Sequence, residues 1–482
     1  MIWLVCSLRI DVCSAREGKQ YWRQSKPISR KSESGSTSNH LPTSVSEFGD
    51  GYSAQEDATA TQSQNGGNGN TLIFNVLDYG AKGDGTTDDT KAFGAAWRDA
   101  CEQEGSTMTI PSGSTFLVQP ISFSGSNCTS NIVFQLDGKI IAPTSFESWG
   151  SGLLQWIEFT NLQGIIVAGK GTIDGQGSAW WHNAPTDNPT DESEQVAPEK
   201  KELHLNGRKL NTKMPSTKPT ALRFYGSQNV TVTGIVIQNS PQTHLKFDDC
   251  KAVKVFELSV SSPGISPNTD GIHLQNSQDV VIYNTALACG DDCVSIQTGC
   301  SNVNIHNVNC GPGHGISIGG LGKDETKACV SNITVRDTTM RNTLTGVRIK
   351  TWQGGMGTVQ GVMFSNIQVS EVETPMVIDQ FYCDKEECQN KTSAVAISGI
   401  TFENIRGTYI MHPSYFACSD SSPCMDLSLN TIELNPAQVN DTNGPFCWQA
   451  YTEVKTNAAP PIDCLKMGKP LNNPIQFNHD SC

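Results

Sequence analysis

The sequence predicts an all-β fold, a parallel β-helix in which the chain coils into stacked rungs. Short aliphatic and β-branched segments recur along most of the chain, and no helical apolar pattern separates them. Strands that repeat in this way without crossover helices favour a solenoid over alternating strand–helix units. From the middle of the chain onward, equivalent aliphatic residues recur at intervals of 23 to 38 positions, at Val230, Val253, Val280, Val303, Ile333, Val362 and Ile400.

The residue before most of these segments is Asn, Asp or Gly, as at Asn131, Gly164, Asn229 and Asp279. These residue types tolerate the left-handed backbone conformation that a tight turn between two faces of a coil needs. We therefore expect turns at these positions, each followed by a strand.

The ordered part of the chain is expected to begin with a strand near Leu72–Val76, followed by one amphipathic helix. Thr87 or Asp88 offers the N-cap, and an apolar stripe at helical spacing follows. One helix before a run of strands suits the cap that covers the open end of a solenoid. The stripe consists of Phe93, Ala96, Trp97, Ala100 and Cys101.

The domain boundary is expected near position 70. Residues 1–70 combine a weak targeting segment with a Ser-, Gly- and Gln-rich region that is too poor in apolar residues to fold. Residues 71–482 then form the β-helix domain. Two stretches interrupt the repeat: a polar excursion from about Ala179 to Lys218, expected as a surface loop, and the part after Asn435, which loses the strand pattern and is expected to seal the second end.

The chain has 17 cysteines, which indicates disulfides and an oxidising compartment. Spacing favours pairs between Cys293 and Cys310, Cys383 and Cys388, and Cys418 and Cys424. The net charge of −14 disfavours partners such as nucleic acid and anionic membranes, and no stretch is apolar enough to span a bilayer. We expect a secreted, extracellular or cell-wall protein, and five glycosylation sequons agree with this: Asn127, Asn229, Asn332, Asn390 and Asn440.

Three polar residues share one position in the repeat. Asp270, Asp292 and His314 each lie two residues before the first aliphatic residue of a segment, and these segments begin 22 residues apart (272, 294 and 316). Stacked rungs lie about 4.8 Å apart, so the three side chains should line up on one face. Asp291 adds a third carboxyl, which should point away from its neighbour Asp292.

Two cations follow on the next rung, Arg348 and Lys350, whose alternation places them on one face. A single Asp is more often a turn residue and a single His a satisfied one, but the joint alignment favours a catalytic site. Glycoside hydrolysis needs two carboxyl roles, and crowding of like charges keeps one carboxyl protonated. The chemistry indicated is cleavage of an acidic sugar polymer, with no cofactor and no metal expected.

Four segments resemble the signature segments of polygalacturonases, the family 28 glycoside hydrolases of pectin: Asn268-Thr269-Asp270-Gly271, Gly290-Asp291-Asp292, Cys310-Gly311-Pro312-Gly313-His314-Gly315 and Arg348-Ile349-Lys350. Segments near Phe74 and Gly171 and the pair Trp180-Trp181 resemble the plant branch. The resemblance covers residue 72 to the C-terminus. It implies a right-handed β-helix and hydrolysis of α-1,4-linked galacturonan by inversion.

The resemblance also implies a role for each matched residue. Asp291 corresponds to the general acid, Asp270 and Asp292 to the pair that activates water, and His314 to the histidine that supports them. Arg348 and Lys350 are implied to bind substrate carboxylates and Tyr382 to contact the substrate. Asn268, also placed among the substrate-binding residues, is implied to orient the acidic site. Gly320 and Cys289 depart from the family pattern, and neither is expected to touch a proposed catalytic group.

Three alternatives stay open on this fold. A pectate lyase would need calcium and leave an unsaturated sugar, which the histidine motif and three acids disfavour. A rhamnogalacturonan hydrolase suits the two cations less well than a substrate with uronates on both sides of the cut. A noncatalytic wall protein that binds pectin is disfavoured by the full acid set. We expect a monomer; endo or exo action, ester tolerance and pH optimum stay open.

Overall fold

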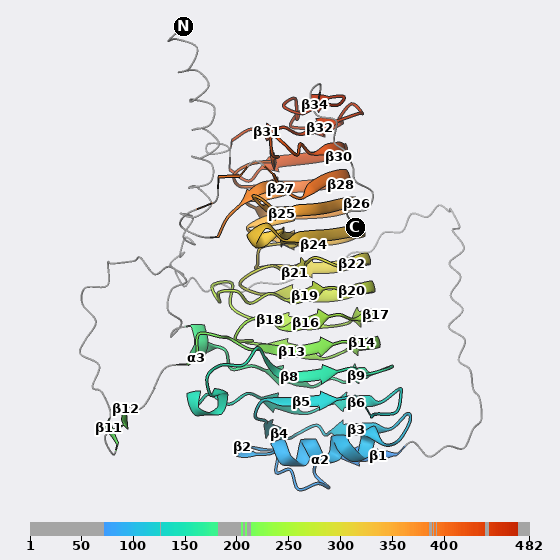
Figure 1. Ribbon diagram of the computed structural model, residues 1–482, viewed down its shortest axis with the longest axis vertical. Coiled ribbons are helices and arrows are strands. Elements are labelled where there is room, and N and C mark those ends of the chain that lie inside the picture. Colours follow the sequence, from blue (N-terminus) through green and yellow to red (C-terminus); the bar gives the residue numbers. More distant parts are fainter. Residues whose placement is uncertain are drawn as a thin grey trace, which may run out of the picture. The chain divides into compact units, whose positions relative to one another are not determined.

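The computed structural model describes residues 72–125, 127–181, 204–205, 208–209, 214–384, 388, 390–391, 393–438 and 443–470. These residues form a right-handed parallel β-helix, as predicted. Figure 1 shows its rungs following one another in chain order, from α2 and β1 to β30 and β34. Residues 1–70 lie outside the described residues, so the targeting segment and the disorder expected there stay predictions.

Within the described residues, the parallel strands form two long sheets: the first gains one strand with every coil, and the second gains two short strands per coil in the N-terminal half and one long strand per coil thereafter. The first, here called the β5–β31 sheet, consists of β5 (Ile121–Ser124), β8 (Gln155–Thr160), β13 (Thr220–Tyr225), β16 (Leu245–Asp248), β19 (Ile272–Gln275), β21 (Val294–Ile296), β23 (Ile316–Leu321), β25 (Thr345–Trp352), β27 (Thr374–Tyr382), β29 (Ser414–Ala417) and β31 (Phe446–Trp448).

The second sheet wraps the other sides of the coil. It consists of β1 (Ile73–Asn75), β2 (Asp84–Asp88), β3 (Thr107–Ile110), β4 (Thr115–Leu117), β6 (Val133–Leu136), β7 (Lys139–Ile141), β9 (Ile166–Ala168), β10 (Thr172–Asp174), β14 (Gln228–Thr233), β15 (Val236–Gln238), β17 (Lys251–Phe256), β18 (Ser259–Ser261), β20 (Gln278–Ala288), β22 (Ser301–Cys310), β24 (Lys327–Arg341), β26 (Met356–Val372), β28 (Ala396–Tyr409), β30 (Met425–Pro436) and β33 (Ala458–Ala459).

The rung positions predicted from the sequence are confirmed residue by residue. The seven aliphatic residues from Val230 to Ile400 pair one to the next in the parallel register of adjacent strands. The residues that precede them have left-handed backbone conformations, with φ of 53° at Asn229, 57° at Asp279 and 55° at Asn302. Asparagine and aspartate tolerate this region better than most residues, which explains their recurrence at the turns.

The predicted capping helix is α2 (Thr90–Cys101), and it lies against β1, β3 and β5 at the first end of the coil (Figure 1). The predicted N-cap, Thr87 or Asp88, was wrong by one or two residues. Asp89 precedes the helix, and its carboxylate accepts hydrogen bonds from the backbone of Lys82 and Gly83 instead of capping the helix. The carboxylate of Asp88 instead accepts a hydrogen bond from the amide of Thr90, the first residue of the helix, at 3.0 Å.

The expectation that the strand pattern ends after Asn435 was too strong. Short strands continue there, because β33 still pairs with β30, and β32 (Tyr451–Thr452) pairs with β34 (Lys466–Met467). Most of the excursion from 179 to 218 lies outside the described residues, apart from the paired segments β11 (His204–Leu205) and β12 (Arg208–Lys209). Trp180, in the short helix α3 (Ser178–Trp181), is buried against Trp149 and so belongs to the body of the fold.

The three predicted disulfides are present, together with bonds between Cys101 and Cys128 and between Cys447 and Cys464. Four of the sequon asparagines, Asn127, Asn229, Asn332 and Asn390, are exposed, and their glycosylation stays a prediction.

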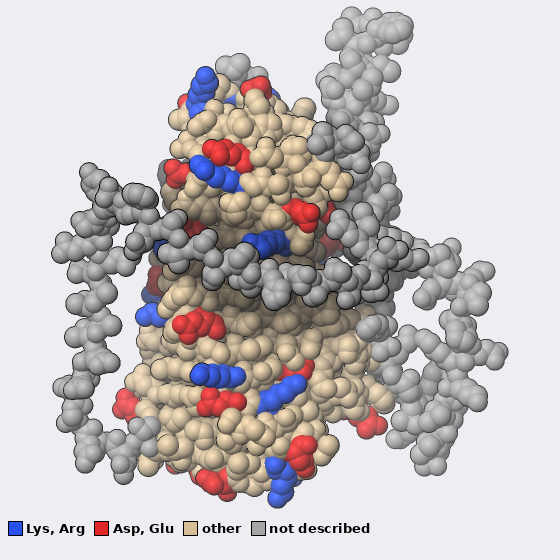
Figure 2. All heavy atoms as spheres, turned by 180° about the vertical axis from the view of Figure 1, so that it is seen from behind, with Lys and Arg blue, Asp and Glu red and all other residues tan. Residues whose placement is uncertain are grey.

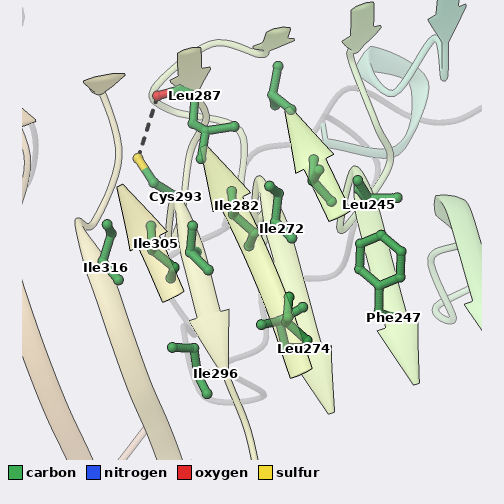
Figure 3. Packing of buried hydrophobic residues seen from close by; sticks show 14 of the residues in the cluster. Leu245, Phe247, Ile272, Leu274, Ile282, Leu287, Cys293, Ile296, Ile305 and Ile316 are labelled. Carbon is green, nitrogen blue, oxygen red and sulfur yellow. Dashed lines mark hydrogen bonds between the residues drawn. The ribbon is translucent and has the colours of Figure 1, made fainter. Parts of the chain in front are cut away.

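The interior is one continuous apolar core filled from both sheets. Figure 3 shows Leu245, Ile272 and Ile296 of one sheet facing Ile282 and Ile305 of the other. The core includes an aromatic stack in which the ring centroids of Phe159, Phe224 and Phe247 follow each other at 5.2 Å. Because side chains alternate along each strand, the intervening residues of the β5–β31 sheet face outward and are free to carry chemistry.

On the face seen in Figure 2, basic and acidic side chains are interspersed and neither sign gathers into a continuous patch. This face therefore offers no broad cationic surface to an acidic ligand. No helix in the described part of the chain has the length and apolar character of a membrane span.

Candidate active site

Adjacent rungs bring Asp270, Asp292 and His314 together as predicted. Ile272 pairs with Val294, and Val294 with Ile316, so the residues two positions earlier lie in line on consecutive coils. The turns are tied to each other by the backbone as well, because the amide of His314 donates to the carbonyl of Asp291 at 2.7 Å. The rung geometry alone thus assembles the acidic cluster.

Asp291 is paired with His314. Nδ1 of the histidine lies 2.9 Å from Oδ1 of the carboxylate. Burial opposes ionisation of Asp291, but this hydrogen bond and the charges of His314, Lys350 and Arg348 outweigh it and lower the pKa of Asp291 below the ordinary value. In the free protein the ionised form of Asp291 is therefore favoured, and its carboxylate is hydrogen-bonded to His314.

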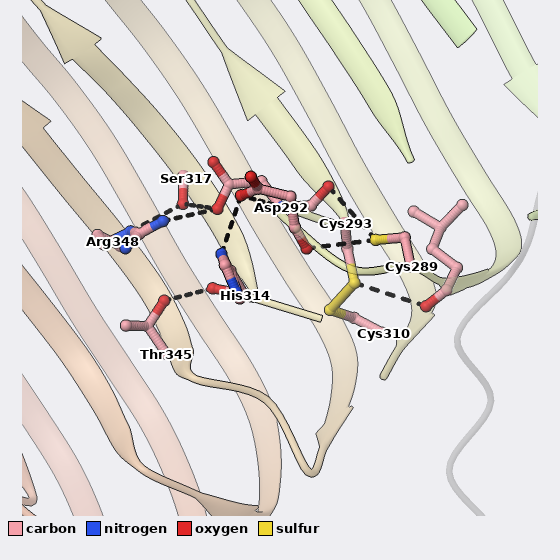
Figure 4. The surroundings of a disulfide bond; sticks show 10 residues. Cys289, Asp292, Cys293, Cys310, His314, Ser317, Thr345 and Arg348 are labelled. Carbon is pink, nitrogen blue, oxygen red and sulfur yellow. Dashed lines mark hydrogen bonds and ion pairs between the residues drawn. A yellow bond between two sulfur atoms is a disulfide. The ribbon is translucent and has the colours of Figure 1, made fainter. Parts of the chain in front are cut away.

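Asp292 faces the other way, as its alternation with Asp291 predicted, and is almost completely buried. Its Oδ1 accepts hydrogen bonds from Arg348 Nη2 at 2.7 Å and Ser317 Oγ at 2.8 Å (Figure 4). Its Oδ2 accepts a hydrogen bond from Lys350 Nζ at 2.8 Å. The two cations expected to serve a ligand are thus held by a carboxylate of the protein. Although burial disfavours charge on both, the nearby acids raise the pKa of Arg348 and of Lys350.

Asp270 is the third carboxyl, and it behaves in the opposite way to Asp291. Burial, followed by the charges of Asp291 and Asp292, raises its pKa well above the ordinary value. Its Oδ2 lies 3.3 Å from Nδ1 of His273, whose own pKa burial lowers to about 3. Asp270 therefore holds a proton more firmly than Asp291 does, beside a histidine that is neutral near pH 7.

Sulfur atoms support the turn that carries Asp291 and Asp292 (Figure 4). The buried thiol of Cys289 donates to the backbone oxygen of Asp291 at 3.3 Å, and burial raises the pKa of this thiol. The disulfide between Cys293 and Cys310 ties the end of this turn to the end of β22. Cys289, which departs from the family pattern, is thus a structural part of the acidic turn.

Two predicted residues remain, Tyr382 and Asn268, and in the described part of the chain only Tyr382 contacts a residue of the site. The ring of Tyr382 is centred 5.2 Å from Lys350 Nζ and packs edge-on against Trp352, so Tyr382 belongs to the cationic side of the site. Asn268 is exposed, with φ of 57°. Within the described residues its side chain makes no hydrogen bond to the acids, so its expected orienting role stays a prediction.

Sequence reasoning assigned no role to Ser317 or His273. Both occupy the alternate positions of their strands, between aliphatic residues that point inward, and both reach an acid of the cluster. The alternation that identified Arg348 and Lys350 could have found them.

Asp291, Asp292 and His314 place potential metal-ligand atoms within 4.8 Å of one another. Both oxygens of Asp292, however, already accept hydrogen bonds from a cationic side chain. Arg348 and Lys350 thus supply the positive charge that a metal ion would bring, and the residues fit a metal poorly.

A β-helix that carries three interacting carboxyls, one of them protonated, beside fixed cations has the parts of a glycosidase. The family model of glycosyl hydrolases family 28 matches residues 101–212 and 202–445. A probable polygalacturonase of Arabidopsis thaliana is 39% identical over 397 residues, which is 82% of this chain and 84% of that protein. A polygalacturonase of Cryptomeria japonica is 40% identical over 75% of this chain and 67% of its own length. The chain belongs to glycosyl hydrolases family 28 and is a glycosidase.

Solved structures share the fold. An endo-xylogalacturonan hydrolase from Aspergillus tubingensis superposes with a TM-score of 0.66 at 22% identity, covering 80% of this chain and 98% of its own. An exopolygalacturonase from Thermotoga maritima gives a TM-score of 0.60 at 20% identity, covering 77% and 90%. At these identities the likeness concerns the architecture alone.

Proposed function

We propose that this enzyme hydrolyses α-1,4-galacturonosyl bonds of pectin, with polygalacturonate as its substrate, by a single displacement that inverts the anomeric carbon. One observation carries the proposal: three carboxyls lie on adjacent rungs beside Arg348 and Lys350, and the pKa of Asp270 is raised while that of Asp291 is lowered. The polygalacturonases among its relatives, 36–40% identical to this chain, support the choice of substrate.

In the proposed mechanism Asp291 protonates the departing oxygen, and Asp270 and Asp292 activate the attacking water. The free protein instead favours a proton on Asp270 and a charge on Asp291. A uronate carboxylate that binds Arg348 and Lys350 would neutralise part of the charge that lowers the pKa of Asp291. Substrate binding therefore raises the pKa of Asp291 and moves the proton to the acid that needs it.

The cationic side of the site has the geometry to accept such a carboxylate. Arg348 and Lys350 are fixed by Asp292, and the ring of Tyr382 lies beside Lys350. Arg348 presents several N–H donors in a fork, which suits a planar carboxylate. The same cations that contact Asp292 would thus orient the sugar acid next to the bond that breaks.

We also propose that the enzyme acts as a secreted monomer on the cell wall. The disulfides, including the one beside the catalytic turn, are stable in an oxidising compartment. The exposed sequon asparagines suit the same location.

The test is incubation of the purified, correctly oxidised protein with de-esterified polygalacturonate. We expect new reducing ends, no ultraviolet-absorbing unsaturated product, and unchanged rates after a chelator. Proton NMR at early times should show the anomer opposite to that of the substrate bond. Unsaturated products with chelator sensitivity would identify a lyase, and tight binding without any product would identify a noncatalytic protein.

Asp291→Asn keeps the shape of the side chain and removes the proton donor. It should lower the turnover of polygalacturonate by at least about a hundredfold, the size of effect that a general acid contributes. A folded variant with near-normal turnover would remove Asp291 from the role of acid.

A further inference from the structure

One outward-facing row of residues crosses the β5–β31 sheet from the cationic side of the site toward the N-terminal coils. Starting at Arg348, the register passes through Ser317, Ser295 and His273 to Lys246 and then Arg223. Lys246 is therefore one rung beyond His273, and about 19 Å along the stack from Arg348 at about 4.8 Å per rung. The row carries cations on both sides of the acidic cluster.

The two cations at the far end of this row differ in their partners. Arg223 is held between two acids, with Nη1 2.9 Å from Glu158 Oε1 and Nη2 2.7 Å from Asp248 Oδ2. The ammonium of Lys246 makes no ion pair or hydrogen bond to any described residue, although the side chain is half-buried. A partly desolvated cation without a partner is costly, and burial accordingly lowers the pKa of Lys246.

The neighbours of Lys246 do not supply the missing anion. Asp248, two residues along the same strand, already binds Arg223. His273 on the next rung is neutral, since burial lowers its pKa to about 3. Asp270 raises the pKa of Lys246 through space, but it makes no ion pair or hydrogen bond with the ammonium. The position thus has an ammonium ready to accept an anionic group from outside.

An aromatic side chain lies on the neighbouring rung, opposite Asp248 and so diagonal to Lys246. Tyr225 points outward from β13, one rung from Lys246, and is 38% exposed, while the guanidinium of Arg223 lies 4.8 Å from its ring centroid. Aromatic faces combined with a few placed polar groups are usual in small-ligand and sugar sites. Arg223 fixes the ring, and the ring and Lys246 together form a surface with an apolar and a cationic part.

We propose that Lys246 binds the carboxylate of a second uronate residue of the polysaccharide, on the N-terminal side of the acidic cluster, and that Tyr225 contacts the same sugar. This inference rests on the proposed function and deepens it. A methyl ester at that sugar would remove the charge that Lys246 recognises. The enzyme should therefore select stretches of pectin with free carboxyl groups both at the cleavage point and beyond it.

The test measures equilibrium binding to de-esterified polygalacturonate and to the same polymer after methyl esterification, using Asp291→Asn protein so that no cleavage occurs. Lys246→Gln in that background should weaken binding to the de-esterified polymer about tenfold, the size expected for a hydrogen bond to a charged group. Binding to the esterified polymer should change much less. Lys246→Arg should restore the preference, because it keeps the charge.

Lys251→Gln is the matched control, since Lys251 is an exposed lysine on β17 of the other sheet. It should leave both affinities unchanged. Equal binding by the Lys246→Gln and Lys246 proteins would overturn the inference, as would an equal loss on both polymers accompanied by a lower melting temperature. These results are separate from the proposed function, which fails only if the wild-type protein releases no reducing ends.

Discussion

His314 and Asp291 face each other across two coils, with 2.9 Å between Nδ1 and Oδ1. The contact exists because the segments that follow them are in register and because the backbone of one turn is bonded to that of the next. A histidine hydrogen bond is one of the forces that lower the pKa of Asp291, so His314 controls the proposed acid without having to touch the substrate.

Replacing His314 should therefore change both rate and pH dependence. In His314→Ala the pKa of Asp291 rises, and because the acid acts in its protonated form, the alkaline limb of the pH–rate profile should move to higher pH. The rate at the optimum should fall by about a hundredfold from lost positioning. His314→Gln keeps a donor and should recover part of both effects. Initial rates on polygalacturonate from pH 3 to 8 provide the measurement, and an unmoved alkaline limb would contradict the link.

Asp292→Asn should be strongly destabilising, because it leaves Arg348 and Lys350 buried without their counter-ion. Breaking a buried pair costs about 3–5 kcal/mol. The control is Glu433→Gln, which removes an exposed partner of Arg406 at 3.5 Å and should cost less than about 1 kcal/mol. Urea unfolding of the two variants would show the difference, and similar costs would mean that the Asp292 cluster is not desolvated as described.

His244 should make stability depend on pH. It is fully buried, with its ring bonded to the carbonyl of Asp270 and to Ser262, and burial lowers its pKa from 6.5 to about 4. The unfolded chain binds a proton below about pH 6.5 while the folded protein does not, so stability is lost between pH 6.5 and about 4, by about 1.4 kcal/mol per pH unit. The loss from pH 7 to 5 should be smaller in His244→Gln. Equal losses would refute this.

The disulfide between Cys293 and Cys310 should stabilise both the fold and the acidic turn. Its sequence separation is 17, for which the loop-entropy account gives about 3 kcal/mol. The double variant Cys293→Ser/Cys310→Ser should lose about this much unfolding free energy and also activity, because the turn with Asp291 and Asp292 gains freedom. Removing the bond between Cys383 and Cys388, whose separation is 5, should cost less. Full activity without the first bond would contradict a positioning role.

The aromatic stack beneath Arg223 and Tyr225 should be a main source of stability for the N-terminal coils. Phe224 is fully buried between Phe159 and Phe247, so Phe224→Ala should cost about 3–5 kcal/mol through the cavity it leaves. Phe224→Leu fills most of that space and should cost clearly less. Chemical unfolding measures both, and equal costs would indicate that the stack, rather than the filled volume, matters.

The arrangement of the rungs could be predicted from the sequence because it depends on short-range patterns. The aliphatic alternation recurs in each coil, and so do the turn residues at Asn229, Asp279 and Asn302. Together they determine the register in which each strand pairs with the strand of the preceding coil. The start of α2 was misplaced by one or two residues, because the position of Asp89 is set by hydrogen bonds to the loop at Lys82 and Gly83, which no local pattern reveals.

The position of the acidic cluster could also be predicted, since register carries side chains to one face. The partnership of Asp292 with Arg348 and Lys350 could not, because repeat positions say which rung a side chain occupies but not which of several neighbours it contacts. The pKa values of the acids are even harder to predict from the sequence. They depend on burial and on the sum of nearby charges, as the opposite shifts of Asp270 and Asp291 illustrate.

The uneven spacing of the repeat has an evolutionary consequence. Between Val230 and Val253 a coil uses 23 residues, and between Val362 and Ile400 it uses 38, yet both pairs remain directly opposite each other. Additional residues are therefore accommodated outside the ladder of paired strands. A lineage can lengthen or exchange such loops, and so alter which branches and decorations of a polysaccharide are admitted, while the reacting groups keep their places.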